Sequence, residues 1–459
     1  MLVVKTLLVA VVMCLLIAGC SMSLPLPVPA TPTPMAGTEP RRTLVEREFD
    51  LSAGEAVVSL RASAPGTDWG RRGAEAATVS IYLDDKYRAD IVLFRGETAF
   101  DYQALLGTVT GGKHKVSVYL EPAKSAASVR DVQVEDLTTR VYEPTDPLYV
   151  VMAHAPILYG REDARYSDTP LLMYHEVTKD AISTTIQYTI IFSNEDGGTA
   201  PDGLMARWGR LTDIEFVYRV SLDAQGQILG AQFQDKDHHE PPYAGSREGF
   251  HPLLKDVTRN NLFADSGTSP YRFALVPTQR LTEGSREELM DLNPWTYLVM
   301  AQEWQREGQD ATEKTASPQT RAVSDPRNYL YLEYRSGPTG SGPCDAKLAV
   351  QARLRGAETW YSSDHGVDSL RIQSVGWHRA AIELPPGTAA DQVEALRFAV
   401  YPGKNQPQCS LTISELRKAF LLDERYQPGP SVVTWQGSET IAPVAAEEPG
   451  LFTIPVGRR

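Results

Sequence analysis

Six carboxylates and two histidines lie in one short stretch of the chain, residues 212–240, which reads TDIEFVYRVSLDAQGQILGAQFQDKDHHE. Four of the acids, Asp213, Glu215, Asp235 and Asp237, lie toward its two ends. Apolar and polar residues alternate on both sides of DAQGQ, a pattern that predicts two antiparallel strands joined by a tight turn. Asp223 suits the first position of a type I turn, and Gly226 suits the left-handed position that closes a three-residue loop with a bulge. This turn would pair Asp223 with Gln227.

The turn sets the predicted register of the hairpin. In antiparallel strands the numbers of facing residues have a constant sum, which is 450 for Asp223 and Gln227. Glu215 is therefore expected to face Asp235, and Asp213 to face Asp237. Side chains two residues apart share a face of a strand, so all four carboxylates are expected on one side. Like charges directly opposite one another destabilise a sheet, and such a cluster should hold protons at raised pKa or bind a cation.

The residue types indicate which cation would bind. Oxygen ligands alone favour a hard ion, Ca²⁺ or Mg²⁺. The neighbouring His238 and His239 offer different chemistry, because imidazoles bind transition metals and also act as acid or base. A register shifted by one residue, or a hairpin end that opens into water, would instead leave the acids solvated. The sequence leaves these alternatives open.

The segment GRLTDIEFV, residues 209–217, and the preceding strand IQYTIIFSNED, residues 186–196, resemble a motif of known proteins. They are similar to the GHRHDWE heptad and its preceding strand in the necrosis- and ethylene-inducing-like proteins. In that family the Asp and Glu of the heptad bind a divalent ion beside a site for the sugar headgroups of membrane lipids. The resemblance implies that Asp213 and Glu215 are metal ligands and that Asp196 is a third.

This sequence departs from the family heptad at several positions, and the gap after Asp196 is longer than in the family. Arg210 and Thr212 stand where the family has histidines, and Ile214 stands where it has tryptophan. The resemblance covers about a third of the chain.

The whole chain predicts a mainly β protein. Its 459 residues, 42% of them hydrophobic, suffice for about three domains of roughly 150 residues each. Short alternating strands separated by Gly and Pro predict three β-rich domains, β-sandwiches, of which the central one is α+β with C-terminal helices. The predicted segments are a signal peptide (1–19), a Pro-rich tether (20–42), an N-terminal β-sandwich (43–143), a central domain with the acidic hairpin and helices (148–308), a C-terminal β-sandwich with a disulfide (328–426) and an extended tail (427–459).

The first residues predict export and anchoring. Lys5 precedes an apolar run, residues 7–17, which is too short for a membrane span and is typical of a signal peptide. Residues 17–20, IAGC, resemble a bacterial lipobox, which implies cleavage before Cys20 and acylation of its thiol. The alternative is an ordinary signal peptide. Acylated Cys20 would make a lipid bilayer the partner and would place the protein in the bacterial cell envelope, facing the extracytoplasmic side.

The other cysteines and the charge complete this description. Cys344 and Cys409 are expected to form a disulfide, because an exported chain meets an oxidising environment. Two cysteines without a local CxxC spacing are a weak signal for a metal site.

The formal net charge is −13, with 45 Lys and Arg against 58 Asp and Glu and no basic block, which argues against nucleic acid as a partner.

These observations predict a membrane-anchored surface lipoprotein that binds extracellular or surface carbohydrate with a divalent cation. Aromatic side chains such as Trp69, Trp360, Tyr361 and Trp377 would stack on sugar rings if they are exposed. One alternative is a hydrolase of extracellular polysaccharide, in which the acids with His238 or His239 supply the acid, base or metal. Another is a structural envelope protein. Neither GxSxG nor HExxH occurs in the sequence, so whether the protein is an enzyme stays open.

Overall fold

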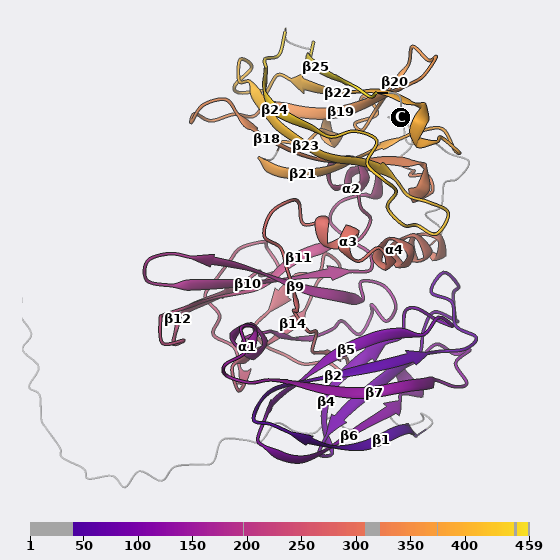
Figure 1. Ribbon diagram of the computed structural model, residues 1–459, viewed down its shortest axis with the longest axis vertical. Helices are drawn as coiled ribbons and strands as arrows, with labels where there is room; N and C mark the ends of the chain where they lie inside the picture. The colour runs from indigo at the N-terminus through magenta and orange to yellow at the C-terminus, as the bar shows by residue number, and fades with distance from the viewer. Residues whose placement is uncertain (1–39, 196, 308–321, 374, 445–447, 458–459) are drawn as a thin grey trace, which may run out of the picture. The chain divides into compact units, whose positions relative to one another are not determined.

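The computed structural model describes residues 40–195, 197–307, 322–373, 375–444 and 448–457 (Figure 1). The predicted signal peptide, the predicted lipidation site Cys20 and nearly all of the predicted tether lie outside the described residues, as does the predicted ligand Asp196. Within the described part, no helix has both the length and the apolar character needed to cross a bilayer.

The chain is mainly β, as predicted, and its first strands form a β-sandwich of two antiparallel sheets. Inward-facing residues of both sheets, such as Val58, Val79 and Val118, are fully buried between them. One sheet has the order β1 (Arg42–Leu51), β6 (Gly112–Leu120), β3 (Thr78–Leu83), β4 (Lys86–Val92), and the other has β5 (Phe100–Val109), β2 (Gly54–Ser63), β7 (Gln133–Tyr142).

The central part combines two sheets with helices. The larger sheet has the order β12 (Ile228–Phe233), β11 (Ile214–Leu222), β10 (Thr184–Phe192), β9 (Pro170–Lys179), β17 (Gln279–Arg280). The smaller has β13 (Arg247–Glu248), β14 (His251–Asp256), β8 (Ile157–Tyr159), β16 (Arg272–Phe273), with β15 (Phe263–Ala264) on β14. The helices are α1 (Tyr149–Ala153), α2 (Pro201–Trp208), α3 (Glu288–Leu292) and α4 (Trp295–Arg306). The predicted C-terminal helices are thus present as α3 and α4.

The remaining strands form another β-sandwich, which contains the predicted disulfide between Cys344 and Cys409. One sheet has the order β21 (Gly376–Glu383), β18 (Tyr329–Pro338), β23 (Leu411–Leu421), β24 (Trp435–Ile441). The other has β20 (Trp360–Ser362), β19 (Lys347–Leu354), β22 (Val393–Tyr401), β25 (Gly450–Pro455).

The prediction of an extended tail over 427–459 is wrong. β24 pairs with β23 and β25 pairs with β22, so both strands complete the sheets of the sandwich. The two strand sequences are short, contain Gly or Pro, and show no clear alternation of apolar and polar residues. The strands are placed by pairing with strands that are distant in the sequence.

A buried ion network ties α3 to this sandwich. The guanidinium of Arg379 on β21, which is fully buried, donates to Asp291 Oδ1 (3.1 Å) and to Glu333 Oε2 (2.7 Å). Lys418 pairs with Asp291, Glu333 and Glu288. The three carboxylates lie close enough together to hold a metal ion, but protein cations already neutralise them.

The substitution Arg379→Met should therefore lower the free energy of unfolding strongly. Removing one partner of a buried pair leaves uncompensated charge and costs about 3–5 kcal/mol. The matched control is Arg353→Met, because Arg353 pairs with Glu394 at a partly exposed position, where such a pair contributes about 0–1 kcal/mol. Chemical unfolding followed by fluorescence measures both; equal losses of stability would contradict the role given to Arg379.

Candidate functional site

The predicted hairpin turn is present. Asp223 N–H donates to the carbonyl of Gln227 (2.9 Å), and Gly226 takes the left-handed conformation with φ of +77°. Asp223 Oδ1 also accepts the N–H groups of Gln225 (2.9 Å) and Gln227 (2.8 Å), which holds the loop closed. The turn residues therefore act as the sequence predicts.

A β-bulge next to the turn changes the register. Leu222 pairs with Ile228, whereas Ser221 pairs with Gly230, so Leu229 is an extra residue on β12. The predicted register is thus wrong by one residue for the rest of the ribbon, and the last pair joins Tyr218 to Phe233.

The shift separates the predicted ligands, because one residue of slip turns every side chain of a strand to the other face. Gln234, rather than Asp235, takes the face of Glu215, and its side chain hydrogen-bonds the Glu215 carboxylate. The prediction that Asp213, Glu215, Asp235 and Asp237 share one face is therefore wrong. The structure places them in two groups with different surroundings.

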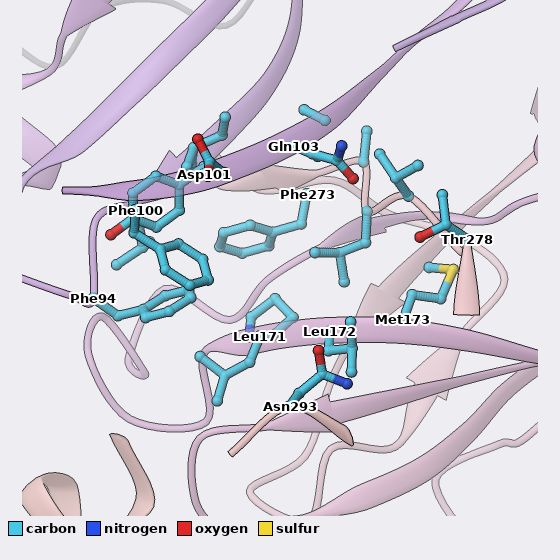
Figure 2. Close-up of a pocket in the computed structure, with 18 of the residues that line it drawn as sticks. Phe94, Phe100, Asp101, Gln103, Leu171, Leu172, Met173, Phe273, Thr278 and Asn293 are labelled. Atoms are coloured by element: carbon cyan, nitrogen blue, oxygen red, sulfur yellow. The ribbon is translucent and has the colours of Figure 1, made fainter. Parts of the chain in front are cut away.

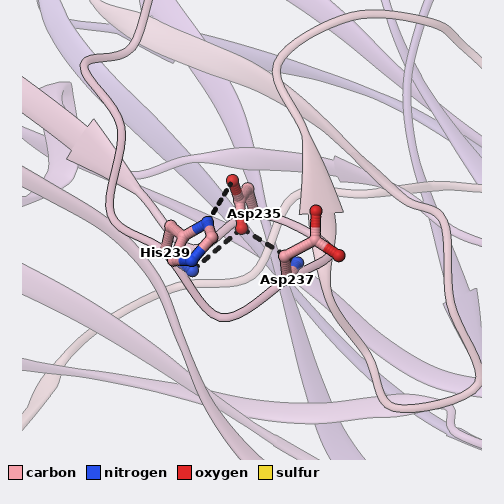
Figure 3. Close-up of side chains that lie close together, drawn as sticks. All are labelled: Asp235, Asp237 and His239. Carbon is pink, nitrogen blue, oxygen red and sulfur yellow. Dashed lines mark hydrogen bonds and ion pairs between the residues drawn. The ribbon is translucent and has the colours of Figure 1, made fainter.

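The exposed group consists of Asp235, Asp237 and His239, whose ligand atoms lie within 4.8 Å of one another (Figure 3). Asp235 Oδ1 accepts the backbone N–H groups of Asp237 and His239, each at 2.9 Å. His239 Nδ1 lies 3.7 Å from Asp235 Oδ2, and Asp237 pairs with Lys236 at 2.6 Å. These contacts close a local turn, and the two outer side chains are exposed to solvent.

The buried group centres on Asp213, which immediately precedes β11 and is 1% exposed. Its Oδ2 accepts a hydrogen bond from Asn261 Nδ2 (2.9 Å), and its Oδ1 lies 3.9 Å from Arg210 Nη1. Glu215, two residues along the chain, is half-buried and hydrogen-bonded to Asp213. The two carboxylates that the family resemblance implies therefore do lie together.

Glu195, which the sequence analysis did not single out, belongs to the same group. Its Oε1 accepts from Thr199 N–H (2.6 Å) and from the amide nitrogen of Asn260 (3.1 Å). The Asn260 oxygen accepts from His238 Nε2 at 3.1 Å, and His238 Nδ1 accepts from Gln234 at 2.9 Å. Since Gln234 also bonds Glu215, a chain of polar contacts joins Glu195 to Glu215 through the predicted residue His238.

Burial raises the pKa of every acid in this group. Burial, and then the negative charge of Asp213, raise the pKa of Glu215 to about 8 and that of Glu195 to about 7. Burial also raises the pKa of Asp213, against the attraction of Arg210. Asp256 on β14 has a pKa of about 7 because burial outweighs the nearby Arg161. At neutral pH the cluster therefore retains protons that ordinary carboxyl groups lose.

Asn261 supplies an oxygen that lacks a partner among the described residues. Its side chain is fully buried, its nitrogen donates to Asp213, and its Oδ1 accepts no hydrogen bond from any described residue. A buried amide oxygen without a donor loses the hydrogen bond it would make in water, which costs about 1–3 kcal/mol. This oxygen and the neighbouring carboxylates are all ligands that a hard cation prefers.

The aromatic residues singled out in the sequence are not freely exposed. Trp69 is 1% exposed, and its Nε1 donates to Glu303. Trp360 lies under the guanidinium of Arg397, and Trp377 under that of Arg417. A guanidinium thus covers one face of each of these two tryptophans, and Tyr361 is half-buried.

Comparisons with known proteins find only distant similarity. No family model matches the chain, and no curated protein matches it. The C-terminal domain of EclA, described as a sugar-binding protein, aligns with 16% identity and a TM-score of 0.18 over 22% of this chain and 68% of its own. NLPPya, a necrosis- and ethylene-inducing-like protein, aligns in its glucosamine complex with 11% identity and a TM-score of 0.23 over 30% of this chain and 75% of its own. The mannosamine complex of NLPPya aligns with 12% identity and a TM-score of 0.22, again over 30% of this chain and 75% of its own.

The raised pKa values predict that the metal-free protein loses stability with rising pH. The folded pKa of Glu215 lies above its unfolded value, so its protonated form stabilises the fold fully below about pH 4.5, and this contribution is lost as pH rises through about 8. Melting temperatures in chelator should fall between pH 5 and pH 9. Glu215→Gln, which cannot ionise, should reduce that fall.

The matched control is Glu358→Gln, because Glu358 is exposed. This variant should follow the wild-type pH profile. A melting temperature that stays level or rises toward pH 9 in the wild type, or an identical profile for Glu215→Gln, would contradict the assignment.

Proposed function

We propose that the protein is a surface lipoprotein that binds carbohydrate through a divalent cation held by Glu195, Asp213 and Glu215. The observation that carries the proposal is the electrostatic interaction of these acids with one another, together with the buried Asn261, whose Oδ1 accepts no hydrogen bond from any described residue. The three carboxylates do not lie within 4.8 Å of one another as those of the exposed group do, so binding of an ion would draw them closer together. No other group of acids among the described residues combines burial with mutual repulsion and an unused oxygen.

The donor set suits Ca²⁺ or Mg²⁺. Carboxylate and amide oxygens are the ligands of both ions; Ca²⁺ takes six to eight of them, whereas Mg²⁺ keeps several waters. One divalent cation would offset the repulsion that otherwise keeps protons on the cluster. The family resemblance adds Asp196, which follows Glu195 in the chain and lies outside the described residues. Asp235, Asp237 and His239 are not part of this ligand set.

A polyhydroxylated ligand follows from the chemistry of such an ion. Glu195 and Glu215 are only half-buried, so the cluster borders solvent on their side. Coordination positions that the protein leaves unfilled there would be occupied by water. Neighbouring sugar hydroxyls are oxygen ligands and would replace that water, which makes carbohydrate the ligand class best matched to the site.

The expected effect of the cation is on stability. Millimolar Ca²⁺ or Mg²⁺ should raise the melting temperature of the full-length protein, since a ligand at a hundred times its Kd adds about 2.7 kcal/mol. Chelation should reverse the rise. Asp213→Asn should weaken the response and leave the metal-free protein equally or more stable, because it removes one of the mutually repelling charges.

Asp237→Asn is the matched control, because Asp237 is an exposed acid of the other group and this variant should respond as the wild type does. Equal melting temperatures in chelator, Ca²⁺ and Mg²⁺ would contradict the cation site. A response lost in Asp237→Asn but kept in Asp213→Asn would move the site to the exposed turn.

A glycan array tests the ligand class. At least one glycan that binds with Ca²⁺ or Mg²⁺ and is lost in chelator supports the proposal, whether or not other glycans bind without the cation. Absence of binding in both conditions would contradict it and favour a structural envelope protein. Release of product from labelled polysaccharides would identify the protein as a hydrolase instead.

The proposed location rests on the lipobox pattern at Cys20, which would hold the protein on the extracytoplasmic side of a bacterial membrane. Cys20→Ala should move the protein from the membrane fraction to the soluble fraction, because the acyl chains supply the anchoring energy. Retention of the Cys20→Ala protein in the membrane fraction would contradict acylation at this residue.

A further inference from the structure

A second candidate site lies away from the acidic cluster, in a cavity of about 180 Å³ (Figure 2). Its walls come from the edge strand β5, the start of β9 and the segment 273–279, together with the first residue of α4. None of the residues proposed to hold the cation lines it.

One wall of the cavity is aromatic. The rings of Phe94 and Trp295 are stacked with centroids 5.1 Å apart and an interplanar angle of 15°, and Phe100 meets Trp295 edge-on at 5.3 Å. Figure 2 shows Phe273 beside Phe94 and Phe100 in the same cavity. Trp295 is half-buried. A ligand in the cavity therefore meets aromatic side chains on this wall.

Another part of the lining is the edge of β5, whose backbone N–H and C=O groups can hydrogen-bond a ligand. β5 pairs with β2 on one side, and among the described strands none pairs with its other side. Leu105 N–H donates outward to the carbonyl of Ala274 (2.8 Å). Because alternate residues of a strand direct their N–H and C=O groups to opposite edges, Gln103 and Asp101 direct theirs outward as well. These residues line the cavity, and the Gln103 amide, whose Nε2 donates one hydrogen bond to Ser59 Oγ (3.1 Å), adds an acceptor oxygen and a second N–H.

The charges around the cavity favour a neutral ligand. No Lys, Arg or His is among its lining residues. Its two acids already have cationic partners: Asp90 pairs with Lys124 at 2.7 Å and Asp101 pairs with Arg61 at 3.0 Å. An anion would find no cation, and a cation would find no free carboxylate.

The volume fits a single ring. An apolar cavity of about 150 Å³ accommodates benzene, so this cavity is large enough for one six-membered ring with small substituents. We propose that it binds one neutral pyranose ring, with the C–H face of the sugar on Phe94, Phe100 and Trp295 and its hydroxyls toward Gln103 and the β5 edge. This site shares its ligand class with the proposed function but needs neither the cation nor the acidic cluster.

The test uses full-length protein in chelator, titrated with the methyl glycosides of glucose, galactose and mannose and followed by saturation-transfer NMR and calorimetry. At least one glycoside should bind saturably. Trp295→Ala should weaken this binding about tenfold, which corresponds to about 1.4 kcal/mol and lies within the range that aromatic contacts contribute beyond burial. Trp377→Ala, at a half-buried tryptophan of the last sandwich, is the matched control and should leave the affinity unchanged.

Gln103→Leu keeps the proposal testable if Trp295→Ala fails to fold, because Gln103 is exposed and its replacement removes only hydrogen-bonding groups. It should weaken binding as well. The proposal is overturned if no glycoside binds in chelator, if binding requires Ca²⁺ or Mg²⁺, or if both variants bind as the wild type does. Binding of tetramethylammonium but of no glycoside would likewise overturn it, since it would assign the aromatic wall to a cation.

Discussion

The repulsion among buried carboxylates at the start of β11 is the constraint around which the central part is organised. Asp213 is almost fully buried, and Glu215 and Glu195 lie within its electrostatic influence. Such a group is stable only with protons or with a cation, because desolvation and like charges both oppose ionisation. The partial compensation by Arg210 and Asn261 keeps the acids in place without neutralising them.

The frame that holds this cluster extends into the last sandwich through α3. Arg210 Nε donates to Glu287 Oε1 at 3.1 Å, and Glu287 immediately precedes α3. At the other end of that helix, Asp291 accepts from Arg379 of β21. The short helix thus connects two buried ionic networks. A rigid support of this kind positions the residues that bind the ion more precisely than a loop would.

The sequence predicted the turn of the acidic hairpin but not its register, for a physical reason. Asp223 and Gly226 have local preferences that define the turn. Most of β12 is exposed, including Ile228 at 37% and Leu229 at 57%, and only Phe233 at its end is buried. Where most of a strand is exposed, a shift of one residue is weakly opposed, so the bulge at Leu229 left no signal in the residue pattern.

The other members of the cluster could not be read from spacing. Asn260 and Asn261 come from a loop after β14, more than forty residues from Asp213, and only the packed structure brings them beside Glu195 and Asp213. Cys344 and Cys409 were predictable because few pairings were available. The strands β24 and β25 were not predictable, because their own sequences show no clear period. They are placed by hydrogen bonding to β23 and β22, respectively.

The most direct test of the central claim is a crystal structure grown with Mn²⁺ at pH 8, in which anomalous scattering locates the ion. Mn²⁺ shares the preference of Mg²⁺ and Ca²⁺ for oxygen ligands. We expect an anomalous peak within bonding distance of the carboxylates of Asp213 and Glu215, with Glu195 and Asn261 Oδ1 beside it. An empty cluster, or a peak confined to Asp235, Asp237 and His239, would contradict the account.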